Sequence, residues 1–538
     1  MAYSWWKTRS VVGCVLLPLL VAFLIRIWST GHQDKSSIRD SRVSNLTFEQ
    51  RLPNADCIEV QKVVPGKIYP QDSDDYKTSI ENYWSVPASE QRPACIVRPQ
   101  NAEEVAVVIR ALNANYEERS QIGRKLPSFA VRSGGHSPEA GFANIEGGVL
   151  IDLSVLNEVD VSQDNKVASI GVGARWGEVS TRLDSMGLAI VGGRNSDVGV
   201  GGLVLGGGIS FFSPRFGMVC DNIDSYEMVL ANGTITHATA YEHSDLWRAL
   251  KGGSGNFGIV TRITARTFVA GDVWAGYGYW PHWQAQKILR AFVDFNQPAN
   301  FDEYAAGPIM AFVYVPSIGL RLIASSLVYT RPEPWPRVFN DFNRFWRYWS
   351  TTKVRTLTDA TDELHRASPR GARQFQVTTT VVNDLDTLTT FHGIFVEKSK
   401  VLKNIPGSSF TFTIQPMSAA VTHKGSPNIL GLEKRPKDQP LIIVLLVWVS
   451  TRPEDDDLTQ RVARDIIAQG EAYAETRNTA DPYRYLNYAA SGQEPFPGNG
   501  YENLAFMQDV SRRYDPQAFF QKAKQGGFKL GIDDYLAT

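Results

Sequence analysis

The chain has few cysteines and no excess of positive charge, and each shortage excludes a class of protein. Four cysteines in 538 residues are too few for a disulfide-rich scaffold. A formal net charge of -1 at pH 7 provides no concentrated positive face for phosphate backbones, so we expect no nucleic-acid partner. The composition is otherwise that of an ordinary globular protein, and the length allows two or three domains.

Several catalytic motifs are also missing. The eight histidines show no H-E-x-x-H pattern and no C-x-x-C occurs, so we expect no metal site. The G-x-S-x-G motif of hydrolases and the Walker A sequence are absent as well. Gly253, Gly255 and Gly258 match G-x-G-x-x-G literally, but the predicted order around them is helix, loop, strand. A Rossmann site needs a strand before the glycines and a helix after them, so we reject that interpretation.

An apolar run, Val11 to Ile25, follows Lys7 and Arg9 at the N-terminus. These fifteen residues fall short of a typical hydrocarbon core of about 30 Å, so a signal peptide and a short membrane anchor both remain open. No small-x-small cleavage site follows the run, and basic residues precede it. This pattern favours a single-pass anchor within residues 1–30, and either kind of segment directs the protein to the secretory pathway.

Two further features agree with that compartment. Asn45 begins an N-x-T sequon in a polar stretch, so we expect glycosylation there. Cys57 and Cys95 flank the start of the folded body, where a disulfide and two separate thiols are both compatible with the sequence. Residues 31–82 are interpreted as a polar stalk and lead-in. Cys220 lies among apolar residues and is expected to be a buried thiol.

Residues 83–270 alternate short strands and helices and include two glycine-rich segments. A predicted strand from Phe129 to Arg132 leads into Ser133-Gly134-Gly135-His136, and the glycine-dense stretch Gly192 to Ser210 comes later. Glycines at this density allow backbone N–H groups to approach an anion, which is usually a diphosphate. A purely structural loop is the alternative, but the interleaved valines and leucines indicate packing. We therefore favour a cofactor loop.

After about residue 271 glycine becomes rarer and aromatic residues increase. Alternating runs predict strands separated by helices, which indicates a second domain. In the predicted strand at 410–415, Phe410, Phe412 and Ile414 would form one face, and the other face would be Thr411, Thr413 and Gln415. We expect the walls of a substrate pocket to come from this aromatic domain. Such a lining would suit a lipophilic, polyketide-, terpenoid- or alkaloid-like molecule better than a sugar.

Five motifs in order carry a resemblance to a known family. They are R-S-G-G-H-S at 132–137, V-G-V-G-G-L-V-L-G-G-G at 198–208, N-F-G-I-V at 256–260, Y-L-N-Y at 485–488 and Y-D-P-x-x-F-F at 514–520. From about residue 83 to the end, the chain resembles the berberine-bridge-enzyme-like flavin oxidases of the vanillyl-alcohol-oxidase superfamily. The resemblance implies an α+β fold with a two-part PCMH-type FAD-binding domain at 83–270. It also implies a substrate domain at 271–478, with an antiparallel sheet covered by helices, and a C-terminal segment at 479–538 that returns to the FAD domain.

The resemblance also implies where FAD binds. His136 is expected to be joined covalently to the 8α-methyl group of the flavin, and Tyr485 and Asn487 to approach the ring. Many members carry a second link to a cysteine, but residues 193–198 contain none, so a single link is expected. The remaining residues expected to bind the cofactor are Arg132, Ser133, Gly134, Gly135, Ser137, Val200, Gly201, Gly202, Gly206, Gly208, Gly258 and Ile259.

Tyr488 aligns with the tyrosine that takes a proton from the substrate in similar enzymes, while hydride passes to the flavin and dioxygen then yields hydrogen peroxide. A free phenol has a pKa of about 10 and is a poor base at neutral pH, so a cationic or hydrogen-bonding neighbour is required. The sequence does not identify that neighbour, and a buried core tyrosine is the alternative interpretation. Some relatives use a carboxylate on a substrate-domain strand, but the strand predicted at 441–450 carries no ionisable residue.

We therefore expect an FAD-dependent oxidase that acts on a small, secondary-metabolite-like substrate. A dehydrogenase that uses another electron acceptor is one alternative, and peroxide formed on turnover would exclude it. The other alternative is a non-catalytic, membrane-anchored flavin-binding protein. The presence of His136, Tyr485 and Tyr488 argues against it.

Overall fold

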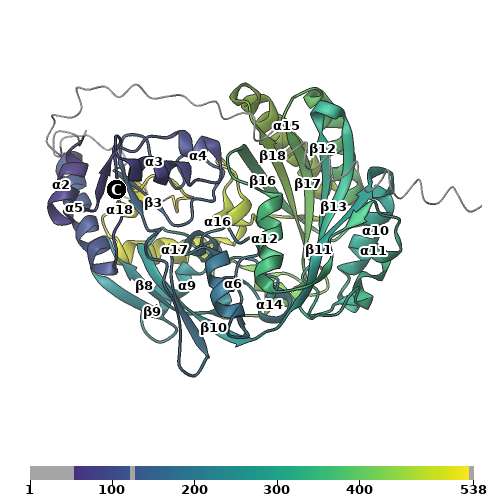
Figure 1. The fold of residues 1–538 in the computed structure, drawn as a ribbon, viewed down its shortest axis with the longest axis horizontal. Coiled ribbons are helices and arrows are strands. Elements are labelled where there is room, and N and C mark those ends of the chain that lie inside the picture. Colours follow the sequence, from purple (N-terminus) through teal and green to yellow (C-terminus); the bar gives the residue numbers. More distant parts are fainter. Residues whose placement is uncertain (1–51, 53, 122–127, 532–538) are drawn as a thin grey trace, which may run out of the picture.

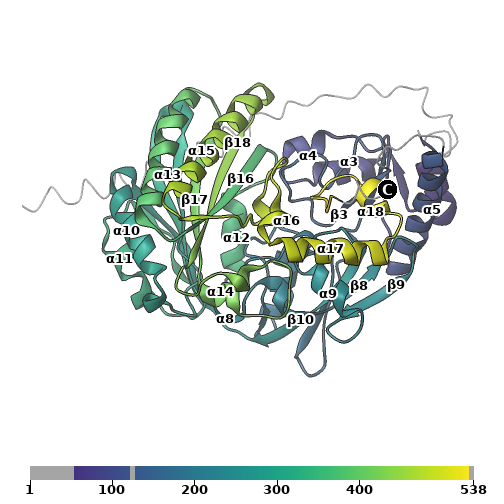
Figure 2. The ribbon, with the colours of Figure 1, turned by 180° about the vertical axis from the view of Figure 1, so that it is seen from behind.

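The computed structural model describes residues 52, 54–121 and 128–531. The predicted anchor at 1–30, the sequon at Asn45 and most of the predicted stalk lie outside these residues. Within the described part of the chain, no helix combines the length and apolar character needed to cross a bilayer. Figure 1 and Figure 2 show the fold from opposite sides, with two sheets in the first half and one large sheet in the second.

The first sheet is small and almost entirely buried. Its strand order is β1-β2-β4-β3, in which β2, β4 and β3 run parallel and β1 is antiparallel to β2. Strands with both faces covered are expected to be continuous apolar runs, as Cys95-Ile96-Val97 is. Strand β3 lies at the edge and leads into the loop that contains His136. The bounds are Ile68–Pro70 for β1, Cys95–Val97 for β2, Phe129–Arg132 for β3 and Val149–Asp152 for β4.

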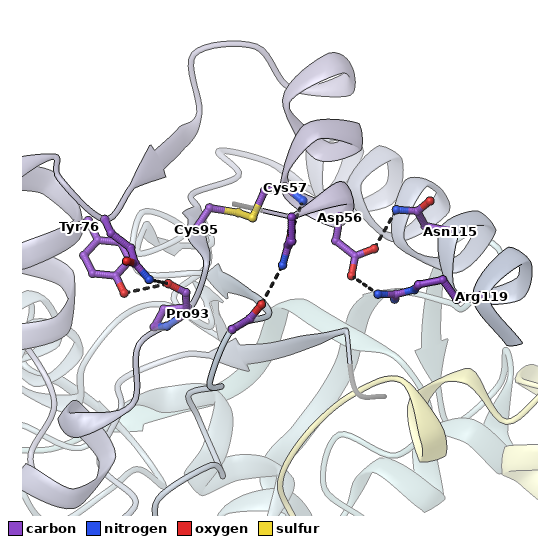
Figure 3. The surroundings of a disulfide bond; sticks show 10 residues. Asp56, Cys57, Tyr76, Pro93, Cys95, Asn115 and Arg119 are labelled. Carbon is purple, nitrogen blue, oxygen red and sulfur yellow. Dashed lines mark hydrogen bonds and ion pairs between the residues drawn. A yellow bond between two sulfur atoms is a disulfide. The ribbon is translucent and has the colours of Figure 1, made fainter. Parts of the chain in front are cut away.

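Residues 54–82, which we expected to end a polar stalk, are instead folded against this sheet. Helix α2 (Ala55–Val63) packs on α5 (Ala102–Gln121), and α3 (Asp74–Glu81) follows β1. Cys57 on α2 and Cys95 on β2 form a disulfide, so the bonded alternative is correct (Figure 3). The polar residues here serve helix ends and ion pairs, which is why their composition resembled a stalk.

The second sheet is antiparallel and has the strand order β5-β6-β10-β8-β9, with β7 also paired to β10. Helix α9 (Ser244–Leu250) precedes the glycine loop 252–258, and β10 follows it, so the rejection of a Rossmann site is confirmed. Cys220 is fully buried, as expected. The bounds are Val159–Val161 for β5, Val167–Gly171 for β6, Leu188–Ile190 for β7, Ile223–Val229 for β8, Ile235–Thr239 for β9 and Ile259–Val269 for β10.

The third sheet contains nine antiparallel strands in the order β14-β11-β13-β12-β17-β18-β16-β19, with β15 also paired to β11. Helices α10, α13 and α15 cover its outer face (Figure 2). The strand bounds are Val273–Pro281 for β11, Ile309–Val315 for β12, Leu320–Tyr329 for β13, Trp349–Ser350 for β14, Lys353–Arg355 for β15, Arg373–Val382 for β16, Ser409–Met417 for β17, Leu441–Ser450 for β18 and Ala480–Asp481 for β19. The helices span Ala285–Phe295 for α10, Leu385–Lys398 for α13 and Asp456–Thr476 for α15.

The two faces of this sheet differ in chemistry. Phe410, Phe412 and Ile414 of β17 belong to the core beneath the helices, so Thr411, Thr413 and Gln415 lie on the opposite face. Other large aromatic residues of this half are also in that core, among them Trp274, Trp280, Phe312 and Trp448. The aromatic residues we expected to line a pocket are therefore mostly core, because helix packing takes up the apolar face of each strand.

Two elements connect the halves. Helix α12 (Leu357–Ala367) lies between β11 of the large sheet and α6 (Trp176–Asp184) of the first half. The C-terminal segment, with α16 (Pro495–Gly498), α17 (Tyr501–Tyr514) and α18 (Phe519–Lys522), runs back across the first half (Figure 2). It ends beside β3, where the backbone N–H groups of Ser128 and Gln525 donate to Ala523 and Phe129, both at 2.7 Å.

Candidate active site

His136 lies in the loop after β3, where two glycine-containing loops touch. A Cβ on Gly134 would stand 2.5 Å from Cα of Gly199, so the backbones can meet only because neither residue has a side chain. Gly135 has a φ of +65°, a conformation that favours glycine. The indole of Trp84 stacks on the imidazole of His136, with ring centroids 4.4 Å apart and planes inclined by 10°. The ring of His136 is thus held in one orientation.

The imidazole of His136 is neutral and has a free nitrogen. Burial lowers its pKa to about 4, against the opposing charge of Asp197. Its buried Nε2 has no hydrogen-bond partner among the described residues and lies 4.0 Å from Oδ2 of Asp197. A neutral imidazole nitrogen with an available lone pair is a nucleophile at pH 7.

Asp197 connects the two halves of the molecule at this point. Arg175 of the first half lies 3.2 Å from Oδ1, while Nε of Arg370 from the second half donates to Oδ2 at 2.8 Å. Burial raises the pKa of Asp197, but the hydrogen bond from Arg370 and the charge of Arg175 outweigh it and hold the pKa below its usual value. Nδ1 of His365 also lies 4.0 Å from Oδ2. The carboxylate is therefore ionised and shared by both halves.

The glycine-dense segment forms a short helix, α7 (Val200–Leu205), against the His136 loop. The backbone N–H of Gly201 donates to Oγ of Ser133 at 3.2 Å, and that hydroxyl donates to the carbonyl of Val172 at 2.6 Å. A Cβ on Gly202 would meet nothing within 4 Å, so the backbone is open there. Gly208 turns the chain at the end of the segment, with a φ of +77°.

The Y-L-N-Y motif packs directly on α7. Nδ2 of Asn487 donates to the carbonyl of Leu203 and to the hydroxyl of Tyr485, both at 3.1 Å. A Cβ on Gly206 would overlap the side-chain amide of Asn487, which accounts for the glycine. Burial raises the pKa of Tyr485 well above its usual value, so its phenol stays neutral.

Tyr488, the last residue of the motif, has the cationic neighbour that its proposed role requires. Nη2 of Arg194 donates to the Tyr488 hydroxyl at 2.9 Å, and Nη1 donates to Oε1 of Gln415 at 2.9 Å. The Tyr488 hydroxyl also lies 3.4 Å from the same Gln415 oxygen. Arg194 comes from the glycine-dense loop and Gln415 from the open face of β17. The three side chains therefore meet where the two halves join.

Other predicted cofactor residues shape the backbone instead of presenting a side chain. The guanidinium of Arg132 pairs with Asp152 at 2.5 Å and stacks over Tyr83, so its side chain is already engaged. Oγ of Ser137 accepts from the backbone of Glu139 at 3.3 Å. The remaining three residues serve packing or the sheet. Val200 is a core residue, and a Cβ on Gly258 would overlap Met228. Ile259 pairs with Val229 in the second sheet.

Sequence reasoning gave no role at this site to Arg194, Asp197 or Lys524, and it placed Gln415 only on a strand expected to contribute to the pocket wall. Arg194 and Asp197 are the charged residues of the glycine-dense stretch, and that position could have singled them out. Gln415 belongs to the polar face of a predicted strand, but nothing in the sequence joined it to Tyr488. Lys524 carried no signal. Its amine has no partner among the described residues, it faces the backbone near Gly255, and burial lowers its pKa to about 8.

These residues fit FAD. The loops after β3 and before α7 touch through Gly134 and Gly199, which have no side chains, and the backbone at Gly202 is open. A free imidazole nitrogen on His136 and an unpartnered amine on Lys524 lie in the same half of the molecule. A nucleophile, a cation and exposed backbone suit a large anionic cofactor.

Comparisons with known proteins agree with this assignment. Residues 93–239 match a family described as an FAD binding domain, a range that includes His136, Asp197 and α7. The chain is 34% identical over 470 residues to the FAD-dependent monooxygenase FUP4 of Fusarium proliferatum, covering 83% of this chain and 87% of that protein. It is 32% identical over 531 residues to the FAD-dependent monooxygenase drtC of Aspergillus calidoustus, covering 97% of each.

Solved structures show the same fold. The 6-hydroxy-D-nicotine oxidase of Arthrobacter nicotinovorans has a TM-score of 0.68 at 22% identity, covering 85% of this chain and 97% of that one. Physcomitrella patens BBE-like 1 has a TM-score of 0.64 at 19% identity, covering 87% and 99%. The expected α+β architecture, a PCMH-type FAD-binding part with a helix-covered antiparallel sheet, is confirmed. The chain is an FAD-linked oxidoreductase that belongs to the same family as these FAD-dependent monooxygenases, and it has the fold of the BBE-like proteins.

Proposed function

We propose that this enzyme is an oxidase that removes a hydride and a proton from a small, secondary-metabolite-like molecule. FAD supplies the hydride acceptor when bound, and dioxygen is the final acceptor, with hydrogen peroxide as product. The observation that carries this proposal is the contact between Arg194, Tyr488 and Gln415 at the junction of the two halves. It combines a proton acceptor, a cation and an open sheet face in one place.

Tyr488 acts as the proton acceptor. The guanidinium of Arg194 lies 2.9 Å from its hydroxyl and stabilises the negative charge that the oxygen carries when it is ready to accept a proton. Gln415 accepts from the other arm of the same guanidinium and keeps it in place. The proton therefore moves to the phenolic oxygen of Tyr488 as the substrate is oxidised.

His136 would hold FAD through a single covalent link. Its neutral imidazole, its free Nε2 and the stacked Trp84 present one orientation of a nucleophile. Asp197 faces the imidazole and would stabilise positive charge on this ring when the cofactor is bound. The loop offers Asn195, Ser196 and Asp197 where a second link would need a thiol, so we propose a single tether.

The experiment is acid precipitation of the purified, flavin-loaded protein, followed by measurement of flavin in the pellet. We expect yellow colour that stays with the protein and is lost from the pellet of His136→Ala. His237→Ala is the matched control, because His237 is exposed on β9. A parent protein that releases all its flavin into the supernatant would disprove the tether, and a protein that purifies without flavin would disprove the whole proposal.

A second candidate, a monooxygenase, is favoured by one observation, since two relatives over 30% identical are named FAD-dependent monooxygenases. The two reactions differ in the fate of dioxygen. Turnover under ¹⁸O₂ distinguishes them: an oxidase forms one peroxide for each product and leaves no ¹⁸O in the product, whereas a monooxygenase inserts it. Turnover with neither peroxide nor ¹⁸O incorporation would indicate a dehydrogenase.

We also propose that the protein resides in the secretory pathway, held by a single-pass anchor within residues 1–30 and glycosylated at Asn45. The Cys57–Cys95 disulfide supports an oxidising compartment. Sedimentation of the full chain with carbonate-washed membranes, with a shift in mass after glycosidase treatment, is the expected result. Recovery of unmodified protein in the cytosolic fraction would refute this location.

A further inference from the structure

A cavity of about 230 Å³ lies between the two halves, beside the contact of Arg194, Tyr488 and Gln415. Ile209 lines it from the first half, and Phe295, Met417 and Ala420 line it from the second. This volume is less than the roughly 300 Å³ at which typical pockets for drug-sized ligands begin. The cavity therefore suits part of a small molecule, not a whole oligomer.

Charge in this cavity is confined to two residues. Arg194 and Asp302 are its ionisable lining residues. Asp302 already accepts hydrogen bonds from the hydroxyl of Tyr329 at 3.2 Å and the backbone of Tyr304 at 2.9 Å. Apolar and small side chains make up most of the remaining wall. The wall is thus mainly apolar and carries two charges, the negative one of Asp302 and the positive one of Arg194, the residue that also contacts Tyr488.

Gln415, another residue of the cavity wall, leaves its amide nitrogen without a partner. A guanidinium can only donate, so the atom of Gln415 that meets Arg194 must be the oxygen, and Nε2 points elsewhere. The side chain is only 4% exposed, and this Nε2 has no partner among the described residues. A buried amide donor without an acceptor is unfavourable, so a ligand oxygen at this position would stabilise it.

We propose that this cavity holds the non-reacting body of the substrate, and that the substrate is a lipophilic molecule with an anionic oxygen, such as a carboxylate, enolate or phenolate. The oxygen accepts from Nε2 of Gln415 and lies near the charge of Arg194, while the apolar body contacts Met417 and Ala420. The inference rests on the proposed function, because it places the reacting carbon beside Tyr488. It assigns the substrate class by chemistry and disfavours neutral sugars.

The test is calorimetric titration of the flavin-loaded protein with 2-naphthoate, with neutral 2-naphthylmethanol and cellobiose as comparison ligands. We expect 2-naphthoate to bind best, and cellobiose to give no measurable heat of binding. Ala420→Leu fills the cavity and should weaken 2-naphthoate at least tenfold. The matched control is Ala472→Leu, an exposed alanine of α15 that should leave binding unchanged.

The variant Gln415→Glu tests the contribution of the amide donor separately from that of the cavity's volume. It retains an oxygen for Arg194 but loses the amide donor, so it should weaken 2-naphthoate more than 2-naphthylmethanol. Ala306→Leu, which narrows the same cavity from another segment, repeats the test if Ala420→Leu fails to fold, as judged by thermal melting. Equal binding of 2-naphthoate by both leucine variants and the parent, or equal binding of cellobiose, would overturn the proposal.

Failure here can be distinguished from failure of the proposed function. Calorimetry reports binding without turnover, whereas acid precipitation reports the His136 tether. A tethered flavin with no preference for 2-naphthoate would overturn the cavity proposal alone. Tight 2-naphthoate binding without acid-stable flavin would leave the cavity proposal intact and remove the tether.

Discussion

The proposed chemistry depends at the residue level on one guanidinium that holds two partners. Arg194 donates through separate nitrogens to Tyr488 and Gln415, and the planar fork of arginine allows both contacts at once. Lysine would retain the charge but has no such fork. The phenol is therefore coupled to a residue that is 294 positions away in the sequence.

Removing this guanidinium should slow catalysis without releasing the flavin. We expect Arg194→Met to lower the rate of anaerobic flavin reduction about a hundredfold, the lower range for loss of acid–base assistance, and Arg194→Lys to lower it less. Stopped-flow absorbance of the flavin with a turnover substrate measures this rate. Since Arg194 is proposed to act through Tyr488, Tyr488→Phe/Arg194→Met should be no slower than Tyr488→Phe alone. If the double variant is instead slowed by the product of the two single-variant factors, the two residues act independently.

At the scale of the element, helix α13 contains a buried histidine whose surroundings disfavour protonation. His392 is 5% exposed and packs against Phe312, with ring centroids 4.6 Å apart. Its Nε2 lies 3.2 Å from Nε2 of His282. One ring therefore donates and the other accepts, and this contact is made with both imidazoles neutral. Burial, together with the charges of His282 and Arg321, lowers the pKa of His392 to about 3.

This burial predicts a loss of stability in acid. An unfolded histidine takes up a proton near pH 6.5, whereas folded His392 does not until about pH 3, so stability falls as pH drops through that window. At pH 5 the cost is roughly 2 kcal/mol. His392→Phe should therefore lose less thermal stability between pH 7 and pH 5 than the parent. His237→Ala, at an exposed site, should retain the parental pH dependence, and the same dependence in His392→Phe would contradict the argument.

Also at the scale of the element, sequence periodicity predicted the positions of the strands well. It could not show which face of a strand lies toward the active site. The alternation at 410–415 separated Phe410 and Phe412 from Gln415, yet which set faced the active site depended on where α10, α13 and α15 pack. The Cys57–Cys95 pairing was left open for a similar reason, because it depends on α2 docking beside β2. The motifs predicted the fold and the loops around His136, since those loops need glycine locally. Contacts between distant segments, such as Arg194 with Tyr488, have no local signature.

The disulfide acts on the stability of the whole molecule. It joins positions 38 residues apart and ties α2 to the first sheet. Closing a loop of that length in the unfolded chain is worth about 4 kcal/mol in the chain-entropy model. We expect Cys57→Ser/Cys95→Ser to melt several degrees lower than the parent, and reductant to lower the melting temperature of the parent alone. A variant that melts with the parent would show that α2 docks equally well without the bond.

The two halves form one functional unit because polar contacts cross between them. Asp197 of the first half accepts from Arg370 of the second, and Arg194 reaches Gln415 on the large sheet. The cavity beside Tyr488 is likewise lined from both halves. Neither half alone contains the complete candidate site.

The return of the C-terminal segment also determines when the site can be completed during biosynthesis. Residues 485–488 pack on α7, and Gln525 pairs with Phe129 at the foot of the strand that leads to His136. These contacts cannot form until the ribosome has translated nearly the entire chain, although the sheets they complete are encoded far earlier. During translation the cofactor loops of the first half therefore remain uncovered by the C-terminal segment. The segment can enclose FAD only after the finished chain leaves the ribosome.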